Sequence, residues 1–315
     1  MKAVLHFRAS PAFRQQLLAA APDWLEVAIV DEADEAAFRR EMLDAEVLLH
    51  VLTPVSAAMI AAAPRLRLIQ KIGVGVNTID LDAARARGIA VANMPGTNSQ
   101  AVAEMTLALM LAALRRIPLL DRATRECRGW TLPPENLDPV GEIAGRTVGL
   151  IGYGEVPRRL APVLQALGAS VLYTARSRKA EAGGEFLALP QLLAAADIVS
   201  LHVPLTPETE RMIDAAALAR MKPGAVLVNT ARGGLVDEAA LVQALQSGRL
   251  RAAGVDVLAV EPAGAGLALA RLDNVVMTPH VAWLTAETLA RSLDVAIENC
   301  RRLRDAHPLL NEVKT

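Results

Sequence analysis

Short β-rich runs alternate along this sequence with longer stretches rich in alanine and leucine. The β-rich runs cover residues 3–7, 46–52, 66–72, 147–151, 170–174, 198–202, 225–229 and 253–257. Strands that alternate with helix-length stretches are typical of parallel sheets, because two parallel strands need a long crossover connection between them. The pattern therefore predicts an α/β fold with two Rossmann-like, doubly wound parallel sheets.

The length of 315 residues fits two domains of ordinary size. The best boundary lies at the turn residues 93–98, just before a long apolar stretch. We expect a first domain over residues 1–98, completed by about 285–315, and a second domain over residues 99–284.

The apolar stretch 101–114 is interrupted only by Glu104 and Thr106. It is apolar on more than one face, which indicates burial on more than one side. An interior helix and a helix at a subunit contact both fit this pattern, and the sequence does not separate them. We expect the protein to be a homodimer.

Composition and charge exclude several classes of protein. Hydrophobic residues make up 53% of the chain, and 33 basic side chains stand against 34 acidic ones. A disordered chain and a broad nucleic-acid surface are therefore not expected. The two cysteines, Cys127 and Cys300, form no disulfide or zinc pattern, and neither a signal peptide nor a membrane span is evident. We expect a cytoplasmic protein that acts on small molecules without a metal, a membrane or a nucleic acid.

Two glycines follow the β-rich run 147–151 and precede an apolar helix and a further β-rich run at 170–174. Gly152 permits a tight turn, and Gly154 lets a pyrophosphate approach the backbone. The free N–H groups at the start of the helix supply a positive dipole. Glycines also end strands in ordinary loops, but the strand, turn, helix, strand order favours a dinucleotide site.

Pro157 stands where the fingerprint of such sites has a third glycine. Proline is tolerated in the first helical turn, so we expect altered helix–strand spacing rather than lost binding. Glu155 and Val156 begin the helix and are expected to contact the cofactor, provided that the Glu155 carboxylate points to solvent.

A basic cluster follows the second strand of this unit, at the position where an acidic residue binds a ribose 2′-hydroxyl. It consists of Arg176, Ser177, Arg178 and Lys179. Guanidinium and hydroxyl groups suit a 2′-phosphate, so the sequence favours NADP(H) as cofactor over NAD(H). The alternative interpretation is a solvated basic loop, which leaves NAD open.

Three polar residues follow apolar strands in the second half of the chain: Arg232, Glu261 and His280. Ligands of α/β proteins bind at such strand ends. Each residue alone is explained by an ordinary turn or surface position, but together they suggest one reaction. The histidines at 6, 50, 202 and 307 have no acidic partner at a meaningful spacing and are expected to be structural.

At these residues the chain resembles the D-isomer-specific 2-hydroxyacid dehydrogenase family. The segments that carry the resemblance are Gly73–Asp80, Arg87–Ile89, Pro95–Asn98, Ala103–Glu104, Asn229–Asp237, Gly254–Pro262 and Thr278–His280. They span nearly the whole chain. The short stretch between Glu261 and His280, followed by Ala282 and Trp283, looks closest to glyoxylate/hydroxypyruvate reductases.

The resemblance implies a site in a cleft between the two domains. Arg232 is then expected to bind the substrate carboxylate and carbonyl oxygen, assisted by the backbone N–H groups of Val74 and Gly75. His280 is expected to donate a proton while hydride reaches the carbonyl carbon. Glu261 is expected to orient the imidazole and to favour its charged form.

The resemblance also implies further contacts to the cofactor and the substrate. The remaining cofactor positions are Val203, Pro204, Thr230 and Asp256. Asp256 has an equally good alternative as a strand-end aspartate that binds backbone groups. Leu52 and Trp283 are the candidates for contact with the substrate side chain.

The sequence thus predicts NADPH-dependent reduction of small 2-oxo acids, such as glyoxylate or hydroxypyruvate, to 2-hydroxy acids. One alternative is an NAD-dependent dehydrogenase of another 2-hydroxy acid, including the phosphorylated hydroxy acids of amino-acid biosynthesis. Another is a dinucleotide-sensing binding module without turnover, because a fold alone does not establish catalysis.

Overall fold

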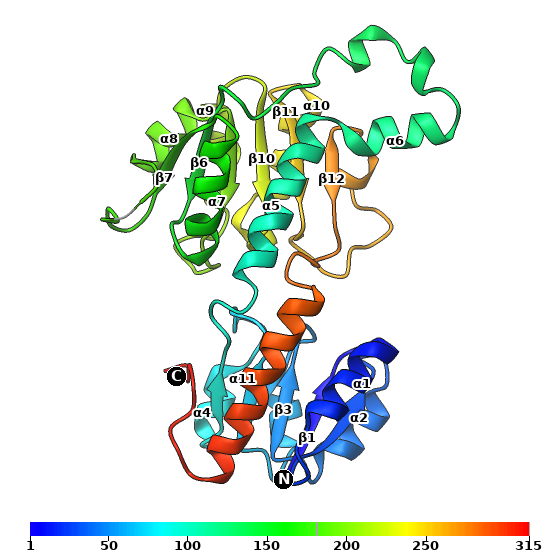
Figure 1. Ribbon diagram of the computed structural model, residues 1–315, viewed down its shortest axis with the longest axis vertical. Helices are drawn as coiled ribbons and strands as arrows, with labels where there is room; N and C mark the ends of the chain where they lie inside the picture. Colours follow the sequence, from blue (N-terminus) through cyan, green and yellow to red (C-terminus); the bar gives the residue numbers. More distant parts are fainter. Residues whose placement is uncertain (181, 315) are drawn as a thin grey trace. The chain divides into compact units, whose positions relative to one another are not determined.

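The computed structural model describes residues 1–180 and 182–314. The chain divides into two compact units, Met1–Asn98 with Leu284–Thr315, and Ser99–Trp283. Each unit contains a parallel sheet with helices on it (Figure 1). The predicted α/β fold class is therefore confirmed.

The first unit has a five-stranded sheet in the order β2-β1-β3-β4-β5. The strands are β1 (Lys2–His6), β2 (Glu26–Val30), β3 (Val47–His50), β4 (Leu68–Lys71) and β5 (Ala90–Ala92), and all neighbours are parallel. The helices are α1 (Pro11–Ala20), α2 (Glu35–Met42), α3 (Ala57–Ala61), α4 (Leu81–Ala86) and α11 (Ala286–Arg304). Every residue of β3 and β4 is buried, as expected for central strands covered on both faces.

Helix α11 joins the first unit although it comes from the far end of the sequence. Its Asn299 side chain is fully buried and donates hydrogen bonds to the Gln70 side chain on β4 (2.6 Å) and to the Leu310 carbonyl (3.0 Å). Gln70 in turn donates to the carbonyl of Ala92 on β5. These buried amide groups are hydrogen-bonded to each other, so they incur no desolvation penalty as unpaired groups. The same bonds fix the register of α11 against the sheet.

The second unit has a seven-stranded sheet in the order β12-β11-β10-β9-β6-β7-β8. The strands are β6 (Thr147–Ile151), β7 (Ser170–Thr174), β8 (Glu185–Phe186), β9 (Ile198–Leu201), β10 (Ala225–Asn229), β11 (Leu250–Val255) and β12 (Val275–Met277). The α-helices are α5 (Ser99–Leu114), α6 (Ile117–Arg125), α7 (Glu155–Ala166), α8 (Leu189–Ala195), α9 (Ala215–Arg220) and α10 (Glu238–Gln246). The chain order reverses between β6 and β9, where open α/β sheets bind ligands.

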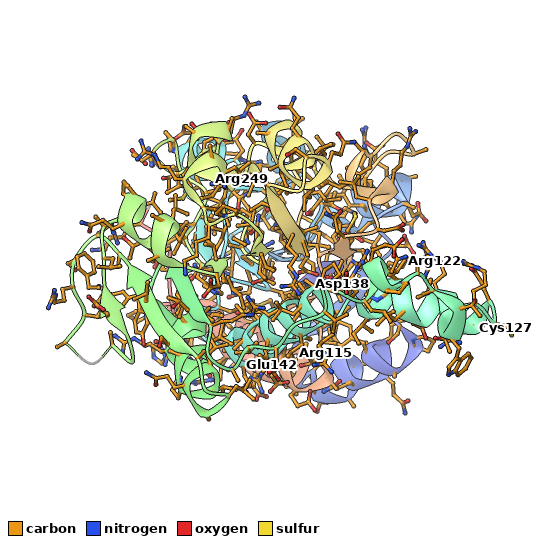
Figure 2. The ribbon with its side chains drawn as sticks, turned by 90° about the horizontal axis from the view of Figure 1, so that it is seen from above. Arg115, Arg122, Cys127, Asp138, Glu142 and Arg249 are labelled. Carbon is orange, nitrogen blue, oxygen red and sulfur yellow. The ribbon has the colours of Figure 1, made fainter. Side chains whose placement is uncertain are left out.

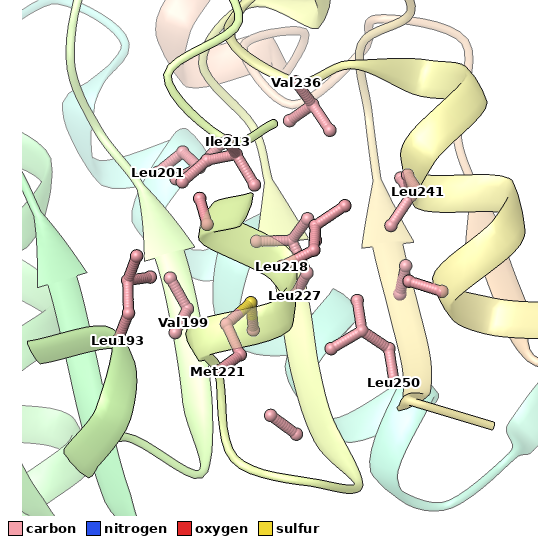
Figure 3. Close-up of a cluster of buried hydrophobic side chains, with 14 of the residues drawn as sticks. Leu193, Val199, Leu201, Ile213, Leu218, Met221, Leu227, Val236, Leu241 and Leu250 are labelled. Carbon is pink, nitrogen blue, oxygen red and sulfur yellow. The ribbon is translucent and has the colours of Figure 1, made fainter. Parts of the chain in front are cut away.

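Successive side chains of each strand point to opposite faces of this sheet, so a hydrophobic core forms on each face. On β10, Val226 and Val228 pack into the core under α5 and α7, whereas Ala225 and Leu227 pack into the core under α8, α9 and α10. Figure 3 shows the second of these cores, with Leu218, Met221 and Leu227 among its labelled side chains. Because both faces are covered, the central strands β9 and β10 are buried along their whole length.

Helix α5 lies over the sheet of the second unit and contacts α7, β10 and β11. Leu109, Met110 and Leu114 are buried, while Leu111 is 37% exposed. Leu109 fits against Gly254 on β11, where a Cβ atom would lie 3.0 Å from the leucine Cβ. The apolar faces of α5 are therefore used largely inside its own unit, in agreement with the interior-helix interpretation.

The segment after α5 extends away from the rest of the second unit (Figure 1). It contains α6 and the two short 3₁₀ helices η1 (Gly129–Thr131) and η2 (Pro134–Asn136). Several of its large apolar side chains are exposed, including Ile117, Leu137 and Trp130, which is 84% exposed. No helix within residues 1–180 and 182–314 combines the length and the apolar character that a membrane crossing needs.

Candidate active site

Three neighbouring strands of the second unit, β10, β11 and β12, end beside one another and carry the predicted reactive residues in the loops that follow. Arg232 follows β10, Glu261 follows β11, and His280 follows β12. Parallel strands place their carboxyl ends at the same edge of a sheet, so residues far apart in sequence meet there.

Glu261 and His280 are in direct contact. The Nδ1 atom of His280 lies 2.6 Å from Oε2 of Glu261, and Oε1 of Glu261 accepts the N–H of Leu258 at 2.8 Å. Burial raises the pKa of the Glu261 carboxyl, but the hydrogen bonds from His280 and Leu258 and the charges of His280 and Arg232 outweigh it, so the pKa is lowered overall. An ionised carboxylate only accepts hydrogen bonds, so Nδ1 of His280 carries a proton. Nε2 is then the ring nitrogen that Glu261 does not engage.

A network of hydrogen bonds fixes the loop that carries His280. The Asp256 carboxylate, which is 1% exposed, accepts from the Thr278 hydroxyl (2.6 Å) and from the N–H groups of Val281 and Ala282 (2.9 Å each). The Asp256 carbonyl accepts the N–H of His280 at 2.7 Å. Asp256 therefore holds the loop, which is the backbone-binding alternative derived from the sequence.

His280 itself has a left-handed backbone with φ of +56°. This conformation is uncommon for a residue with a side chain and persists only where the surroundings impose it. Besides Asp256, the indole Nε1 of Trp283 donates to the His280 carbonyl at 3.1 Å. The imidazole is thus presented from a constrained backbone rather than from a free loop.

The turn that carries Arg232 is shaped by Asn229 at the end of β10. The Asn229 side chain, 1% exposed, accepts the N–H of Ala231 at 3.0 Å and donates to the Arg232 carbonyl at 2.9 Å. The Arg232 guanidinium donates to the Ala231 carbonyl at 2.6 Å. Burial lowers the pKa of Arg232, and the nearby charge of Glu261 opposes that shift.

Gly233 brings the Arg232 turn against the segment that leads to Glu261. A Cβ atom at position 233 would overlap the backbone of Leu258 and approach the N–H of Ala259. Only glycine permits this contact between the two loops. The structure therefore brings Arg232, Glu261 and His280 together. Glu261 and His280 share a hydrogen bond. Arg232 is joined to them by a backbone contact between the loops and by a charge interaction.

The glycine turn after β6 has the geometry that a dinucleotide requires. Gly152 has φ of +96°, and a Cβ atom on it would overlap the carbonyl oxygen of His202. A Cβ atom on Gly154 would meet nothing within 4 Å, so open space lies before the first turn of α7. No side chain caps α7, which leaves its first N–H groups available to an anion.

The residues that begin α7 are compatible with such an anion. The Glu155 carboxylate accepts a hydrogen bond from Arg159 at 2.7 Å, and this arginine lowers the pKa of the carboxyl despite the effect of burial. Val156 is the second helical residue, and Pro157 is buried in the first turn without preventing the helix. These residues fit a phosphate at the helix start.

The opposite wall of the glycine turn is the loop after β9. The Val203 side chain would lie 3.0 Å from a Cβ atom on Gly152, and Pro204 is exposed. The ring of His202 hydrogen-bonds Ser200 at 2.9 Å, and burial lowers its pKa to about 3. Thr230 lies after β10, where its hydroxyl is 2.8 Å from that of Thr106 on α5.

The basic loop after β7 is exposed but anchored. The Tyr173 hydroxyl accepts the N–H of Lys179 at 2.8 Å, and the Arg178 guanidinium lies 5.7 Å from the centre of the Phe186 ring. Arg176 and Ser177 are exposed. Within residues 1–180 and 182–314, none of the cations in this loop forms an ion pair with a carboxylate.

The predicted substrate residues of the first unit lie at the carboxyl edge of its own sheet. Val74 and Gly75 follow β4, and Leu52 follows β3. Val74 is 44% exposed, and its carbonyl accepts a hydrogen bond from the Asn93 side chain at 2.8 Å. Gly73 has φ of +141°, which turns the chain out of the strand.

A buried polar cluster beside this glycine loop was not predicted. Lys71, 6% exposed, ends β4, and its ammonium group lies 3.5 Å from Nε2 of His50 and donates to the Val51 carbonyl. Nε2 of His50 is 2.9 Å from the Thr78 hydroxyl. Burial and the charge of Lys71 lower the pKa of His50 to about 2, so His50 is neutral. The signal in the sequence was a lysine at the end of an otherwise buried strand.

Among the described residues, no three histidine, cysteine, aspartate or glutamate side chains are grouped so that they could hold a metal ion.

Comparison with known proteins matches this chain to one family. The family model described as D-isomer specific 2-hydroxyacid dehydrogenase, NAD binding domain, matches residues 107–282, which lie in the second unit and are more than half of the chain. D-3-phosphoglycerate dehydrogenase of Mycobacterium tuberculosis (strain ATCC 25618 / H37Rv) is 44% identical over 285 residues, covering 89% of this chain and 53% of that protein. The chain thus spans about half the length of the phosphoglycerate dehydrogenases that it matches.

Two further relatives are reductases. Glyoxylate reductase of Aeropyrum pernix is 40% identical over 265 residues, covering 81% of this chain and 79% of that protein. The solved structure of the NADPH-dependent glyoxylate/hydroxypyruvate reductase of Sinorhizobium meliloti, in complex with NADP and malonate, superposes with a TM-score of 0.85 and 31% identity, covering 99% of this chain and 96% of that one. The chain therefore belongs to the D-isomer specific 2-hydroxyacid dehydrogenase family, as its motifs predicted.

Proposed function

We propose that this protein catalyses the NADPH-dependent reduction of a small 2-oxo acid, such as glyoxylate or hydroxypyruvate, to the 2-hydroxy acid. The observation that carries the proposal is the 2.6 Å hydrogen bond between His280 and Glu261 beside the half-buried guanidinium of Arg232. Reduction of a 2-oxo acid needs a group that binds the carboxylate, a proton donor and a source of hydride, and this arrangement supplies the first two.

His280 is the proposed proton donor. Its Nδ1 is engaged by Glu261, so Nε2 is the atom that delivers a proton to the carbonyl oxygen as the carbonyl carbon gains hydride. Glu261 fixes the tautomer and the orientation of the ring. The left-handed backbone of His280 and its bonds to Asp256 and Trp283 reduce the freedom of the donor before substrate binds.

Arg232 is the proposed carboxylate ligand. A guanidinium offers two parallel N–H donors to a carboxylate and stays charged even where burial lowers its pKa. In the proposal, the backbone N–H groups of Val74 and Gly75 bind the same carboxylate, and Leu52 and Trp283 contact the substrate side chain.

The glycine turn and the basic loop are the proposed cofactor site. When bound, a reduced nicotinamide dinucleotide supplies the hydride. Gly152, Gly154 and the start of α7 would hold its pyrophosphate, and Arg176 with its neighbours Ser177, Arg178 and Lys179 would hold the 2′-phosphate. The anchoring of this loop by Tyr173 and the complex of the S. meliloti reductase with NADP support this choice.

The remaining cofactor positions in the proposal are Val203, Pro204, Thr230 and Asp256. Asp256 already accepts three hydrogen bonds from the loop that carries His280, with two of them on Oδ1 and one on Oδ2. Oδ2 retains lone-pair capacity for the nicotinamide carboxamide.

A second candidate is the oxidation of a phosphorylated 2-hydroxy acid such as 3-phosphoglycerate. It is supported by the 44% identity to phosphoglycerate dehydrogenases and by the cationic Lys71 beside the glycine loop of the first unit. A substrate phosphate requires an additional positive charge, which Lys71 offers.

An assay of cofactor absorbance separates these candidates. The purified protein is given NADPH or NADH with glyoxylate, hydroxypyruvate and longer 2-oxo acids, and in parallel NAD⁺ or NADP⁺ with 3-phosphoglycerate. Fastest turnover of glyoxylate or hydroxypyruvate with NADPH supports the first proposal, and turnover confined to 3-phosphoglycerate supports the second. A protein that binds dinucleotide but turns over no substrate would be the sensing module instead.

We further propose a cytoplasmic homodimer. The free thiol of Cys127 is exposed, which suits a reducing compartment. The exposed Ile117, Trp130 and Leu137 on the extending segment offer apolar surface for a second copy. Light scattering after gel filtration tests this, and a Trp130→Ser variant that remains a dimer would argue against that surface.

A further inference from the structure

A cavity of about 620 Å³ lies at the amino-terminal edge of the seven-stranded sheet, opposite the edge that carries the candidate active site. It is formed where β6, β9, β10, β11 and β12 begin, and where α5 ends and α6 starts. The titratable side chains that line it are Arg116, Arg146, Asp197, Lys222, Arg251 and Asp273.

Both acidic residues of this cavity already have partners. Asp197 accepts from Lys222 at 3.0 Å and from the N–H of Thr147 at 2.8 Å. Asp273 pairs with Arg122 at 2.6 Å. Among residues 1–180 and 182–314, no carboxylate lies within ion-pair distance of Arg116, Arg146 or Arg251, although the charge of Arg146 lowers the pKa of the Asp197 carboxyl from further away.

Two of these guanidinium groups converge on one point beside Gly141. A Cβ atom at position 141 would lie 2.7 Å from Nη2 of Arg146 and 2.9 Å from Nη2 of Arg251. Arg146 is held there by its Nε, which donates to the Glu142 carbonyl at 2.6 Å. The absence of a side chain at Gly141 is what leaves room for both groups.

Arg116 completes the cluster from the start of α6. Its Nη1 donates to the Asn136 carbonyl at 2.7 Å, which fixes the side chain, and no side chain caps the helix. Burial lowers the pKa of Arg251, and the charges of Arg146 and Arg116 lower it further. Like charges held together cost stability unless an anion neutralises them.

We propose that this cavity binds a small polyanion of the phosphate class through Arg116, Arg146 and Arg251. Fixed guanidinium forks are the preferred ligands of phosphate oxygens, and three of them suit a group that carries two or more negative charges. The site is distinct from the cofactor site, because β10 begins at the cavity with Ala225 and ends with Asn229 before Arg232, a separation of about 15 Å along the strand.

Calorimetric titration with inorganic pyrophosphate tests the site. The protein is titrated at constant ionic strength after saturation with NADPH, so that the proposed cofactor site is occupied. Arg251→Gln and Arg146→Gln should each weaken binding by about tenfold or more, because each removes a charge-assisted contact to phosphate. Arg176→Gln and Arg232→Gln should leave pyrophosphate binding unchanged, which separates this site from the proposed function.

Arg115→Gln is the matched control. Arg115 stands next to Arg116, is exposed and does not line the cavity, and it is labelled in Figure 2. The Arg115→Gln substitution removes the same charge without removing a ligand, so pyrophosphate binding by this variant should match that of the wild type. Circular dichroism of each variant checks folding, and either arginine variant alone suffices if the other is unfolded.

Three results would overturn the proposal. They are no binding of pyrophosphate to the wild-type protein, unchanged binding by both Arg251→Gln and Arg146→Gln, and an equal loss in Arg115→Gln, which would indicate general electrostatic attraction.

Discussion

His280 and His202 both follow strands of the seven-stranded sheet, yet the structure gives them opposite surroundings. The His280 ring contacts the Glu261 carboxylate at 2.6 Å, whereas the His202 ring contacts the Ser200 hydroxyl at 2.9 Å. Burial without a carboxylate lowers the pKa of His202 to about 3 and makes the ring a neutral structural group. The difference teaches that the partner of a strand-end histidine, rather than its position, decides whether it can serve as an acid.

The largest effect is expected from replacing the paired histidine. His280→Ala removes the proposed proton donor, so kcat for 2-oxo acid reduction should fall by about 10² to 10⁴ fold. His202→Gln should reduce stability more than kcat, because its ring serves only local packing. Steady-state kinetics of both variants measures the difference in kcat. Equal losses of kcat would contradict the different roles of the two histidines.

A smaller loss of kcat is expected when the hydrogen bonds that hold the His280 loop are weakened. Asp256→Asn replaces one acceptor oxygen by an NH₂ group that faces an N–H or O–H donor. The imidazole should then lose its position. We expect kcat to fall by about 10 to 100 fold, although Glu261 and His280 are both still present.

Thr278→Val is the milder control, since it removes one of the three hydrogen bonds to Asp256. Its kcat should lie between those of the wild type and Asp256→Asn. An Asp256→Asn protein with unchanged kcat and a lowered Tm would show that the network serves stability alone.

The buried histidines predict how stability depends on pH. His202 binds a proton only near pH 3 in the folded chain, whereas an unfolded histidine binds one near pH 6.5. Acidification therefore favours the unfolded chain, and the stabilisation is lost progressively as pH falls from 6.5 toward 3. Between pH 7 and pH 5 the free energy of unfolding should fall by about 2 kcal/mol for this residue.

His50, whose pKa is lowered to about 2, should contribute a similar loss over the same interval. Urea unfolding of the wild type, His202→Gln and His50→Gln at the two pH values tests this. Each variant should show a flatter dependence on pH. A dependence unchanged in both variants would mean that neither ring is buried in its neutral form.

The fold and the reactive residues could be predicted from sequence because both are local or periodic signals. Alternation of β-rich and helical stretches specifies parallel sheets, and a polar residue after an apolar strand marks a ligand-binding edge. Arg232, Glu261 and His280 were found in this way. The sequence also offered the backbone-binding role of Asp256 as an alternative.

The supporting contacts could not be predicted, because they depend on distances between segments far apart in sequence. Gly233 shows no need for glycine until Leu258 is seen against it, and Asn229 is one more polar residue at a strand end. Lys71 and His50 come from different strands and meet only in the folded first unit. Such contacts depend on register and loop path, which periodicity does not encode.

The smallest effect is expected in the exposed basic loop. Arg176→Ala should raise the KM for NADPH by about five- to tenfold and leave the KM for NADH unchanged, because an exposed guanidinium binds phosphate in competition with water and salt. Arg115→Ala, another exposed arginine of the second unit, should change neither value. Added salt should narrow the difference between the wild type and Arg176→Ala, whereas the loss in His280→Ala should persist, since proton donation at a constrained, hydrogen-bonded imidazole does not depend on long-range attraction.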